Sequence, residues 1–145
     1  MTVMEALREY IKTCPILDGK RLNVDFLPEA AASCSVDAAP VNPVVKRYID
    51  GSSLRQFSFV LASRALYGEE LRQQLDNLGL FEDFSDWLDR KNRARDFPDL
   101  GTGRRVTKLE VTTSGYIFAP GVNAARYQIQ CRMLYEQAAD YEKEN

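Results

Sequence analysis

The chain contains 145 residues, 45% of them hydrophobic and 28% charged, and its formal net charge is −2. This composition is typical of a single globular domain, here covering residues 1–145, and it argues against a disordered chain. The near-neutral charge and the lack of any apolar run near the roughly 18 residues of a membrane span predict no membrane partner and no general attraction to nucleic acid.

The first predicted element is an amphipathic helix over residues 3–13. Thr2 and Glu5 have the spacing of a capping box, in which the two side chains bond to free backbone N–H groups of the first turn. Pro15 ends the pattern, because proline disfavours helix in the residue before it. One face of this helix is apolar and is predicted to cover a sheet; it is formed by Val3, Met4, Leu7 and Ile11.

Strand patterns follow the first helix. Alternating residues make 22–27 and 33–37 possible strands, and the prolines around them are typical of the edge of a sheet. Residues 44–49 and 54–63 are the next predicted strands, joined by an Asp-Gly hairpin turn at 50–51, where glycine admits positive φ. Because 54–63 is apolar on both faces, it is predicted to be a central strand.

A second helical stretch is predicted over residues 69–92. Its apolar periodicity is interrupted at Gly79, which predicts either one kinked helix or two short helices, since glycine in a helix interior costs about 1 kcal/mol. The periodic apolar residues on either side of this glycine are Leu71, Leu75 and Leu78, then Phe81, Phe84, Trp87 and Leu88.

The last third of the chain is predicted to form a long hairpin, with strands at 106–114 and 126–135 and a loop at 119–123. Gly115 is expected to mark a bulge or a bend. Strict alternation in the second strand predicts one buried face and one wet face. The predicted buried face carries Tyr127, Ile129, Cys131, Met133 and Tyr135, and the predicted wet face carries Gln128, Gln130 and Arg132.

Together these elements predict an α+β fold, in which a mainly antiparallel β-sheet packs against the N-terminal helix and the central kinked or split helix. The core is expected where apolar strand faces meet the two helices. The residues predicted to be buried there are Phe57, Phe59, Trp87, Leu88, Ile129 and Cys131.

An acidic cluster on the central helix has two interpretations. Asp83, Asp86 and Asp89 recur every three residues, so their carboxylates lie near one another on the helix surface. They form either a cation or acid–base site, or a solvated face that meets a partner. One helix face rarely supplies the several oxygen ligands that hard cations require, and no calcium-binding loop pattern is present. The partner-facing interpretation is therefore preferred.

A basic cluster follows, with Arg90, Arg93 and Arg95 at the end of the helix and Arg104 and Arg105 beyond a loop. Such a cluster can bind phosphates, but cations at a helix C-terminus also complement the macrodipole. Interspersed aspartates and the lack of stacking aromatics disfavour nucleic acid. We therefore predict no sequence-specific nucleic-acid binding, and a contact with the acidic cluster of a neighbouring subunit instead.

Aromatic residues flank the last loop. Tyr116, Phe118 and Tyr127 are either core residues or anchors of a protein interface, since tyrosine is enriched at such contacts. Both alternatives stay open. As interface anchors, Tyr116 and Phe118 would add apolar contacts to charge pairs that are weak on their own, unless the tube end serves as a template.

The chain contains no histidine, and its three cysteines form no CxxC pair. Serine–histidine and cysteine–histidine catalysis are therefore excluded, as is the most common general base near neutral pH. A zinc site has almost no ligands available, so the thiols of Cys14, Cys34 and Cys131 are predicted to be reduced. We predict a protein that is not an enzyme and that has no catalytic, cofactor-binding or metal-binding residues.

Several segments, in this order and at this spacing, resemble a family of small minor capsid or tail proteins of long-tailed bacteriophages and prophages of Gram-positive bacteria. That family is in turn similar to tail-terminator, or tail-completion, proteins. The resemblance covers roughly residues 44–137, and residues 14–43 carry no part of it. The segments that carry it are 54–59 with 62–64, then 77–88, then 110–116 with 125–131.

This resemblance implies a structural virion protein, made in the host cytoplasm, that forms a ring at the head-proximal end of the tail tube and joins the tube to the head. The implied partners are further copies of the chain, commonly six in a ring, the tail tube protein and the head–tail connector. A free monomer in dilute solution is compatible with this role. The alternatives are another connector or minor capsid component, and a small regulatory protein-binding module.

Overall fold

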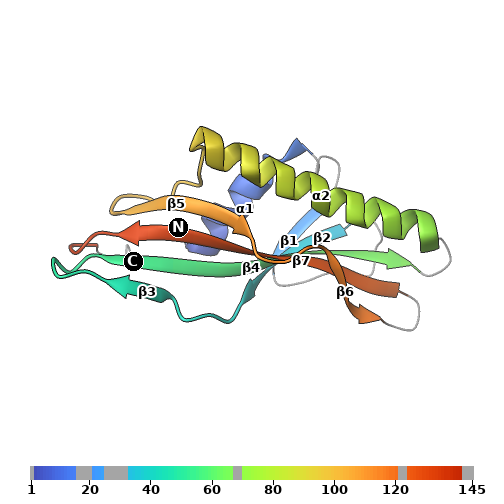
Figure 1. The fold of residues 1–145 in the computed structure, drawn as a ribbon, viewed down its shortest axis with the longest axis horizontal. Coiled ribbons are helices and arrows are strands. Elements are labelled where there is room, and N and C mark those ends of the chain that lie inside the picture. Colours follow the sequence, from blue (N-terminus) through green and yellow to red (C-terminus); the bar gives the residue numbers. More distant parts are fainter. Residues whose placement is uncertain (1, 16–20, 25–32, 67–69, 121–123, 142–145) are drawn as a thin grey trace.

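The computed structural model describes residues 2–15, 21–24, 33–66, 70–120 and 124–141. Within these residues it contains two helices and one seven-stranded sheet (Figure 1). In chain order the elements are α1 (Val3–Ile11), β1 (Arg21–Val24), β2 (Ser33–Ala39), β3 (Val44–Arg47), β4 (Ser53–Leu66), α2 (Glu70–Ala94), β5 (Arg104–Val111), β6 (Tyr116–Pro120) and β7 (Ala124–Gln137). The predicted α+β fold with a mainly antiparallel sheet is confirmed.

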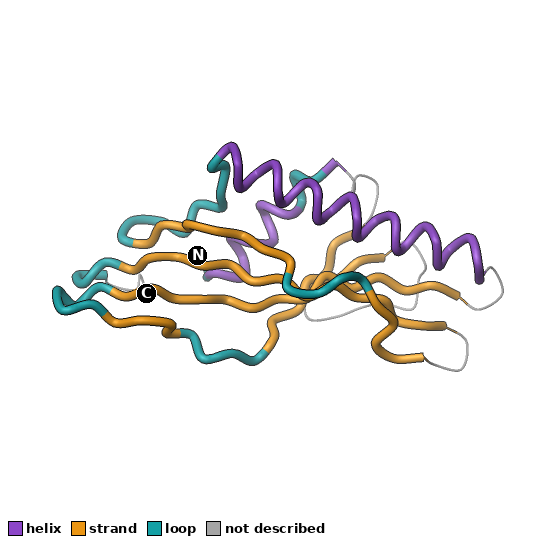
Figure 2. The backbone as a smooth tube through the Cα atoms, viewed as in Figure 1, coloured by secondary structure: helices purple, strands orange, loops and turns teal. Residues whose placement is uncertain are grey.

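Two long antiparallel strands, β4 and β7, form the middle of the sheet and are paired over 14 residues each, from Ser53 opposite Gln137 to Leu66 opposite Ala124. Shorter strands flank this ribbon on both sides (Figure 2). At one end the strand order is β3-β4-β7-β5, and at the other it is β1-β2-β4-β7-β6. All these pairs are antiparallel except β1 with β2, which is parallel.

The flanking strands are short because the sequence interrupts them. Pro40 and Pro43 separate β2 from β3, and proline cannot donate a ladder hydrogen bond. Gly115 separates β5 from β6, where an added Cβ would lie 2.5 Å from Cδ2 of Phe81. Only glycine lets the backbone pass this close to the Phe81 ring, so the predicted bend at Gly115 is confirmed.

The two helices differ from the predictions at their boundaries. α1 begins as predicted, with the Thr2 hydroxyl accepting a hydrogen bond from the Glu5 backbone N–H at 3.1 Å, but it ends at Ile11 rather than at residue 13. α2 is one continuous helix of 25 residues, so of the two predicted alternatives the single helix is correct and the pair of short helices is wrong (Figure 1). A Cβ at Gly79 would meet nothing within 4 Å, and the burial of apolar residues that follow outweighs the cost of one glycine.

A single apolar cluster joins α1, α2 and one face of the sheet. On β4 and β7 it uses odd-numbered residues, as the alternation predicted. Phe59, Trp87, Leu88, Ile129 and Cys131 are buried, as predicted. Phe57 is only partly buried, so that prediction was wrong; Phe57 lies between the stretches of β4 that pair with β3 and with β2.

Candidate functional site

The face of the sheet opposite the apolar cluster carries a hydrogen-bonded polar network, which we call the polar face. Arg126 of β7 forms an ion pair with Asp37 of β2 at 2.6 Å and donates to Oε1 of Gln128 at 3.0 Å. The amides of Gln128 and Gln130 donate to the Tyr116 hydroxyl at 2.7 and 2.9 Å. Tyr116 therefore links β6 to two residues of β7, and the network crosses the sheet from β2 to β6.

A second part of the polar face lies at the other end of β7. Nε of Arg132 donates to Oε1 of Glu110 at 2.7 Å, and Nζ of Lys108 lies 3.1 Å from Oε2 of the same carboxylate. Burial raises the pKa of Glu110, but the hydrogen bonds from Lys108 and Arg132 outweigh burial and hold its pKa below the ordinary value. The carboxylate is therefore held ionised between two cations.

These contacts correct the prediction of a wet face on the last strand. Gln130 is exposed and Arg132 is partly exposed, but Gln128 is only 4% exposed. The amide of Gln128 lies between Arg126 and Tyr116, which satisfy its hydrogen bonds away from water. Gln128 is thus a structural residue of the polar face, and the prediction that it is exposed was wrong.

The aromatic residues near the last loop lie in two different environments. Tyr127 is 2% exposed and belongs to the core, whereas Tyr116 is partly exposed and serves the polar network. Phe118 lies in β6, and its side chain falls outside the described residues. The roles of Tyr116 and Phe118 as interface anchors stay predictions.

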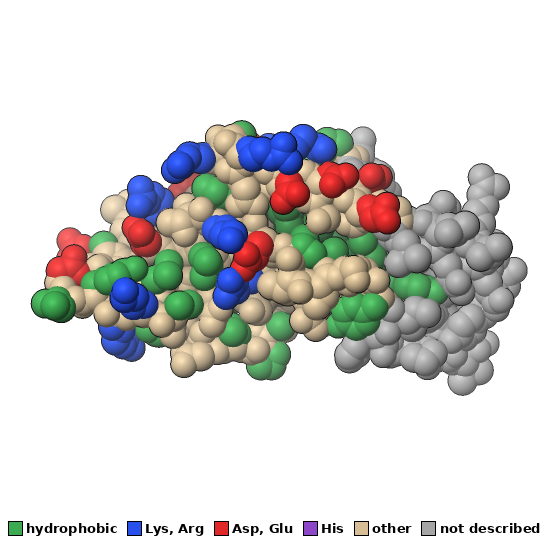
Figure 3. All heavy atoms as spheres, viewed as in Figure 1, with side chains coloured by type: hydrophobic (Ala, Val, Ile, Leu, Met, Phe, Trp, Pro, Cys, Tyr) green, Lys and Arg blue, Asp and Glu red, His purple; other side chains and the backbone are tan. Residues whose placement is uncertain are grey.

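The predicted acidic and basic clusters lie next to each other along α2. Asp83, Asp86 and Asp89 are exposed, and so are Arg90 and Arg93. Figure 3 shows acidic side chains beside basic ones along the upper edge of the molecule, where α2 lies. The part of the α2 surface whose side chains are described therefore carries an acidic stretch followed by a basic one.

The remaining arginines of the basic cluster surround a different feature. Arg95, which has a positive φ of 54°, lines a groove of about 390 Å³ together with Arg104 and Arg105. Arg104 lies over the ring of Tyr141 at 4.6 Å, and Arg105 forms an exposed ion pair with Glu136 at 2.9 Å. The structure thus places Arg95, directly after α2, in one groove with Arg104 and Arg105 at the beginning of β5.

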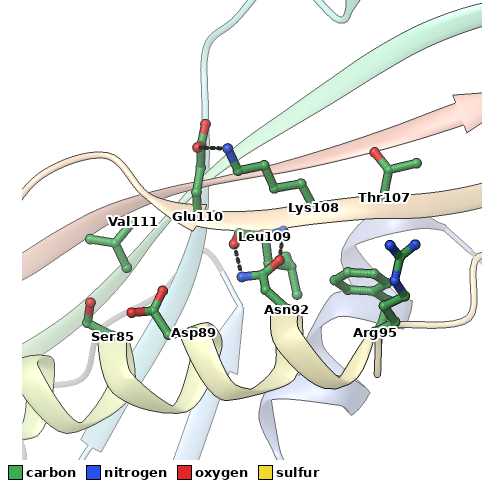
Figure 4. A pocket seen from close by; sticks show the side chains of 10 residues that line it. Ser85, Asp89, Asn92, Arg95, Thr107, Lys108, Leu109, Glu110 and Val111 are labelled. Atoms are coloured by element: carbon green, nitrogen blue, oxygen red, sulfur yellow. Dashed lines mark hydrogen bonds and ion pairs between the residues drawn. The ribbon is translucent and has the colours of Figure 1, made fainter.

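An adjoining groove of about 510 Å³ runs between α2 and the outer edge of β5 (Figure 4); we call it the α2–β5 groove. Asn92 of α2 lies inside it, where its Oδ1 accepts a hydrogen bond from the Leu109 N–H at 2.8 Å and its Nδ2 donates to the Leu109 carbonyl. One side chain therefore occupies the edge of the sheet as a neighbouring strand would. The groove is lined by Ser85, Asp89, Asn92, Arg95, Phe97 and residues 107–111.

Exposed large apolar side chains of the described residues gather in one segment around β3. They are Val41, Val45, Tyr48 and Ile49, with exposed fractions of 39%, 47%, 39% and 108%. Sequence reasoning missed this surface and also missed Asn92. The signal for the surface was an isoleucine directly before the Asp-Gly turn, since such a residue lies at a hairpin tip.

The described residues contain no group of three or more cysteine, aspartate or glutamate side chains placed to hold a metal ion. Within the same residues, no helix is both long and apolar enough to cross a bilayer. Cys14, Cys34 and Cys131 are buried free thiols. Burial raises the pKa of the Cys131 thiol above its ordinary value, so this group is kept neutral and unreactive. In comparisons with known proteins, no family model matches the chain, and no curated protein matches its sequence.

Proposed function

We propose that this chain is a structural virion protein of the phage tail-terminator type, which assembles as a ring on the head-proximal end of the tail tube and joins it to the head. The observation that carries the proposal is the gathering of exposed apolar side chains on 41–49, at the edge strand β3. Exposed apolar residues grouped on one surface are typical of protein–protein contacts.

Three further features support an assembly role. The segments that resemble phage minor capsid and tail-terminator proteins include most of β4, the exposed acidic part of α2 and much of β7. Among the described strands, β3 and β5 are outer strands on opposite sides of the sheet, so one copy can contact two neighbours (Figure 1). Contacts between two different surfaces close into a ring when the rotation between copies allows it.

The accessible part of the polar face, around Gln130 and Arg132, suits a surface that stays in contact with water or with a polar partner. Its cations and carboxylates are already paired within the subunit, as in Arg126 with Asp37 and Arg132 with Glu110. Charges that are already paired attract a charged partner only weakly, so a strongly charged polymer could move past this face without adhering to it. We propose that this face, including Gln130 and Arg132, is turned toward the ring lumen or the tube.

Deletion of the gene in its phage tests the proposed function. We expect tails of abnormal length that fail to join heads, and restoration of both properties when the wild-type protein is supplied from a plasmid. Tail length and head attachment are measured by electron microscopy. A normal yield of complete virions after the deletion would contradict the proposal.

A charge-reversal variant tests the basic surface within the same assay. Arg93→Glu combined with Arg95→Glu reverses two exposed cations, whereas Glu9→Lys on the exposed side of α1 is a matched control. If the basic surface contacts a partner, the double variant fails to restore head attachment and the control restores it. Attachment at the wild-type level in the double variant would exclude this surface as an essential contact.

A further inference from the structure

We propose that neighbouring copies of this chain are joined by the tip of the β3–β4 hairpin of one copy, which inserts its apolar side chains into the α2–β5 groove of the next copy. The proposal rests on the proposed function in taking the assembly to be a ring. It adds the identity of the contact, which the resemblance does not supply.

The hairpin tip, defined as Val45 to Ser52, is a rigid and apolar projection. The Tyr48 N–H donates to the Ser52 carbonyl at 2.9 Å, and the Gly51 N–H donates to the Tyr48 carbonyl at 3.0 Å. Gly51 has a φ of +92°, which the turn requires and which glycine adopts without strain. Ile49 lies in this turn with its side chain completely exposed, so docking would order the side chain but not the backbone, which the turn hydrogen bonds already hold.

The α2–β5 groove is a matching acceptor. Two of its lining residues, Phe97 and Val111, are apolar and partly buried, Leu109 is buried in the core behind them, and the other lining residues are polar or charged. Its volume of about 510 Å³ lies in the range of concave sites that enclose a small ligand. The groove is therefore large enough to receive the side chain of Ile49 together with part of Tyr48.

Basic residues lie beside the hairpin tip, and acidic residues of α2 lie beside the groove. Lys46 and Arg47 are exposed next to the apolar residues of the hairpin tip. Asp89 lines the groove with Arg95 and with the Lys108–Glu110 ion pair, and Asp86 is exposed one turn before Asp89 on α2. Opposite charges at the rim of an interface fix its orientation and speed association, while the apolar anchor supplies most of the affinity.

The positions of the two surfaces favour a head-to-tail contact. β3 and β5 are the outer strands at the same end of the sheet, on opposite sides of the β4–β7 ribbon (Figure 1). A copy that uses its hairpin tip on one side therefore keeps its groove free for the next copy on the other side. Repetition of one such contact generates a ring.

The contact uses side chains rather than an extension of the sheet. β3 is irregular between Val44 and Lys46, and β5 is irregular between Val106 and Lys108. Asn92 also occupies the outward N–H and carbonyl groups of Leu109. Bulges, lysines and covered backbone groups are the devices by which proteins prevent strand-to-strand growth, so the sheet ends at each subunit.

Disulfide cross-linking between copies tests the contact. One preparation carries Ile49→Cys, a second carries Thr107→Cys in the groove, and a third carries the exposed control Glu9→Cys on α1. Native thiols do not compete, because all three are buried. After mild oxidation of mixed preparations, the Ile49–Thr107 product is expected to exceed the Ile49–Glu9 product by about tenfold, because docked thiols have a high effective concentration.

The mixtures are oxidised both in concentrated solution and on isolated tail tubes, so a ring that forms only on the tube is also detected. Equal yields of the two products in both settings would overturn the contact. Ile49→Asp is a second variant, whose fold is unaffected because Ile49 is fully exposed. We expect it to lower the fraction of assembled protein by about tenfold or more, as expected when a charge replaces an apolar anchor. Unchanged assembly of Ile49→Asp would also overturn the proposal.

Failure of the contact and failure of the proposed function give different results. If virions are normal without the gene but the Ile49–Thr107 product forms in excess, the function is wrong and the contact stands. If the wild-type protein restores tail length but the two products form equally, the contact is wrong and the function stands.

Discussion

The two faces of the β4–β7 ribbon are built from alternate residues of the same strands, yet they are stabilised by different forces. The face toward the helices buries side chains such as Phe59, Leu61 and Ile129 in one apolar cluster. The polar face carries ion pairs and hydrogen bonds, including Arg126 with Asp37 and Arg132 with Glu110. The first face is expected to supply most of the stability, because apolar burial contributes more than partly exposed ion pairs do.

The largest expected effect comes from truncating the apolar face. Phe59→Ala should lower the free energy of unfolding by about 3–5 kcal/mol, through lost transfer energy and the cavity left behind. Phe59 is only 1% exposed and lies in the middle of β4. Denaturant unfolding measures the change, with the neighbouring polar-face variant Ser58→Ala as control. A loss below about 1 kcal/mol for Phe59→Ala would contradict the comparison.

The second largest effect is expected from the polar contact between Asn92 and the backbone of Leu109, which lies beside the apolar face. Asn92→Ala removes the partner of both backbone groups of Leu109, and an unsatisfied buried group costs about 1–3 kcal/mol. Arg93→Ala, at the next and exposed position of α2, is the control and should change stability by less than about 0.5 kcal/mol. Equal losses in thermal or denaturant unfolding would show that Asn92 does not protect the edge of β5.

The apolar face should lose stability at alkaline pH. Burial raises the pKa of Cys131, and burial also raises the pKa of Tyr10, helped by Asp96. Because the unfolded thiol ionises near about pH 8.5 and the folded one at a higher pH, its contribution is complete below that value and is lost as pH rises.

The loss at alkaline pH is measured against a matched variant. Above about pH 8.5 the wild type should lose about 1.4 kcal/mol per pH unit more than Cys131→Val, which cannot ionise. Unfolding curves at pH 8.0 and at about pH 9.5 give the difference between the two proteins. Parallel losses in both would mean that Cys131 is accessible to solvent.

The smallest effect belongs to the polar face and appears at acid pH. The depressed pKa of Glu110 means that its contribution is complete above the unfolded value, about 4.3, and is lost as pH falls through the folded pKa. Glu110→Gln should therefore cost about 1 kcal/mol or less near pH 7, since the carboxylate is partly exposed, and should make stability less dependent on pH below about 4.3. If the stability of Glu110→Gln falls with decreasing pH as much as that of the wild type, Glu110 is not the source of the loss at acid pH.

Periodicity was a good guide to the elements of the fold. Alternation located β4 and β7 and their buried residues, and the Asp-Gly turn at 50–51 was found from its sequence. These features are local, so the sequence of a few neighbouring residues decides them. At Gly79 the local pattern left one helix and two short helices both open, because the apolar contacts that maintain the single helix come from distant strands.

The candidate site depended on contacts that no local pattern encodes. The burial of Gln128 follows from Tyr116 and Arg126, and the role of Asn92 follows from a strand that lies well beyond it in the sequence. The groove that brings Arg95 together with Arg104 and Arg105 likewise follows from the position of β5 beside β7.

The order of strands also bears on how the protein is made. β4 pairs with β7 along its whole length, although α2, β5 and β6 all lie between them in the sequence. A nascent chain whose β4 has already emerged must therefore wait until almost the entire polypeptide has left the ribosome before this strand gains its main partner. Pairings between distant segments are slow to form and leave apolar strands open to aggregation. Synthesis of this subunit is thus expected to depend on chaperones that shield β4 during translation.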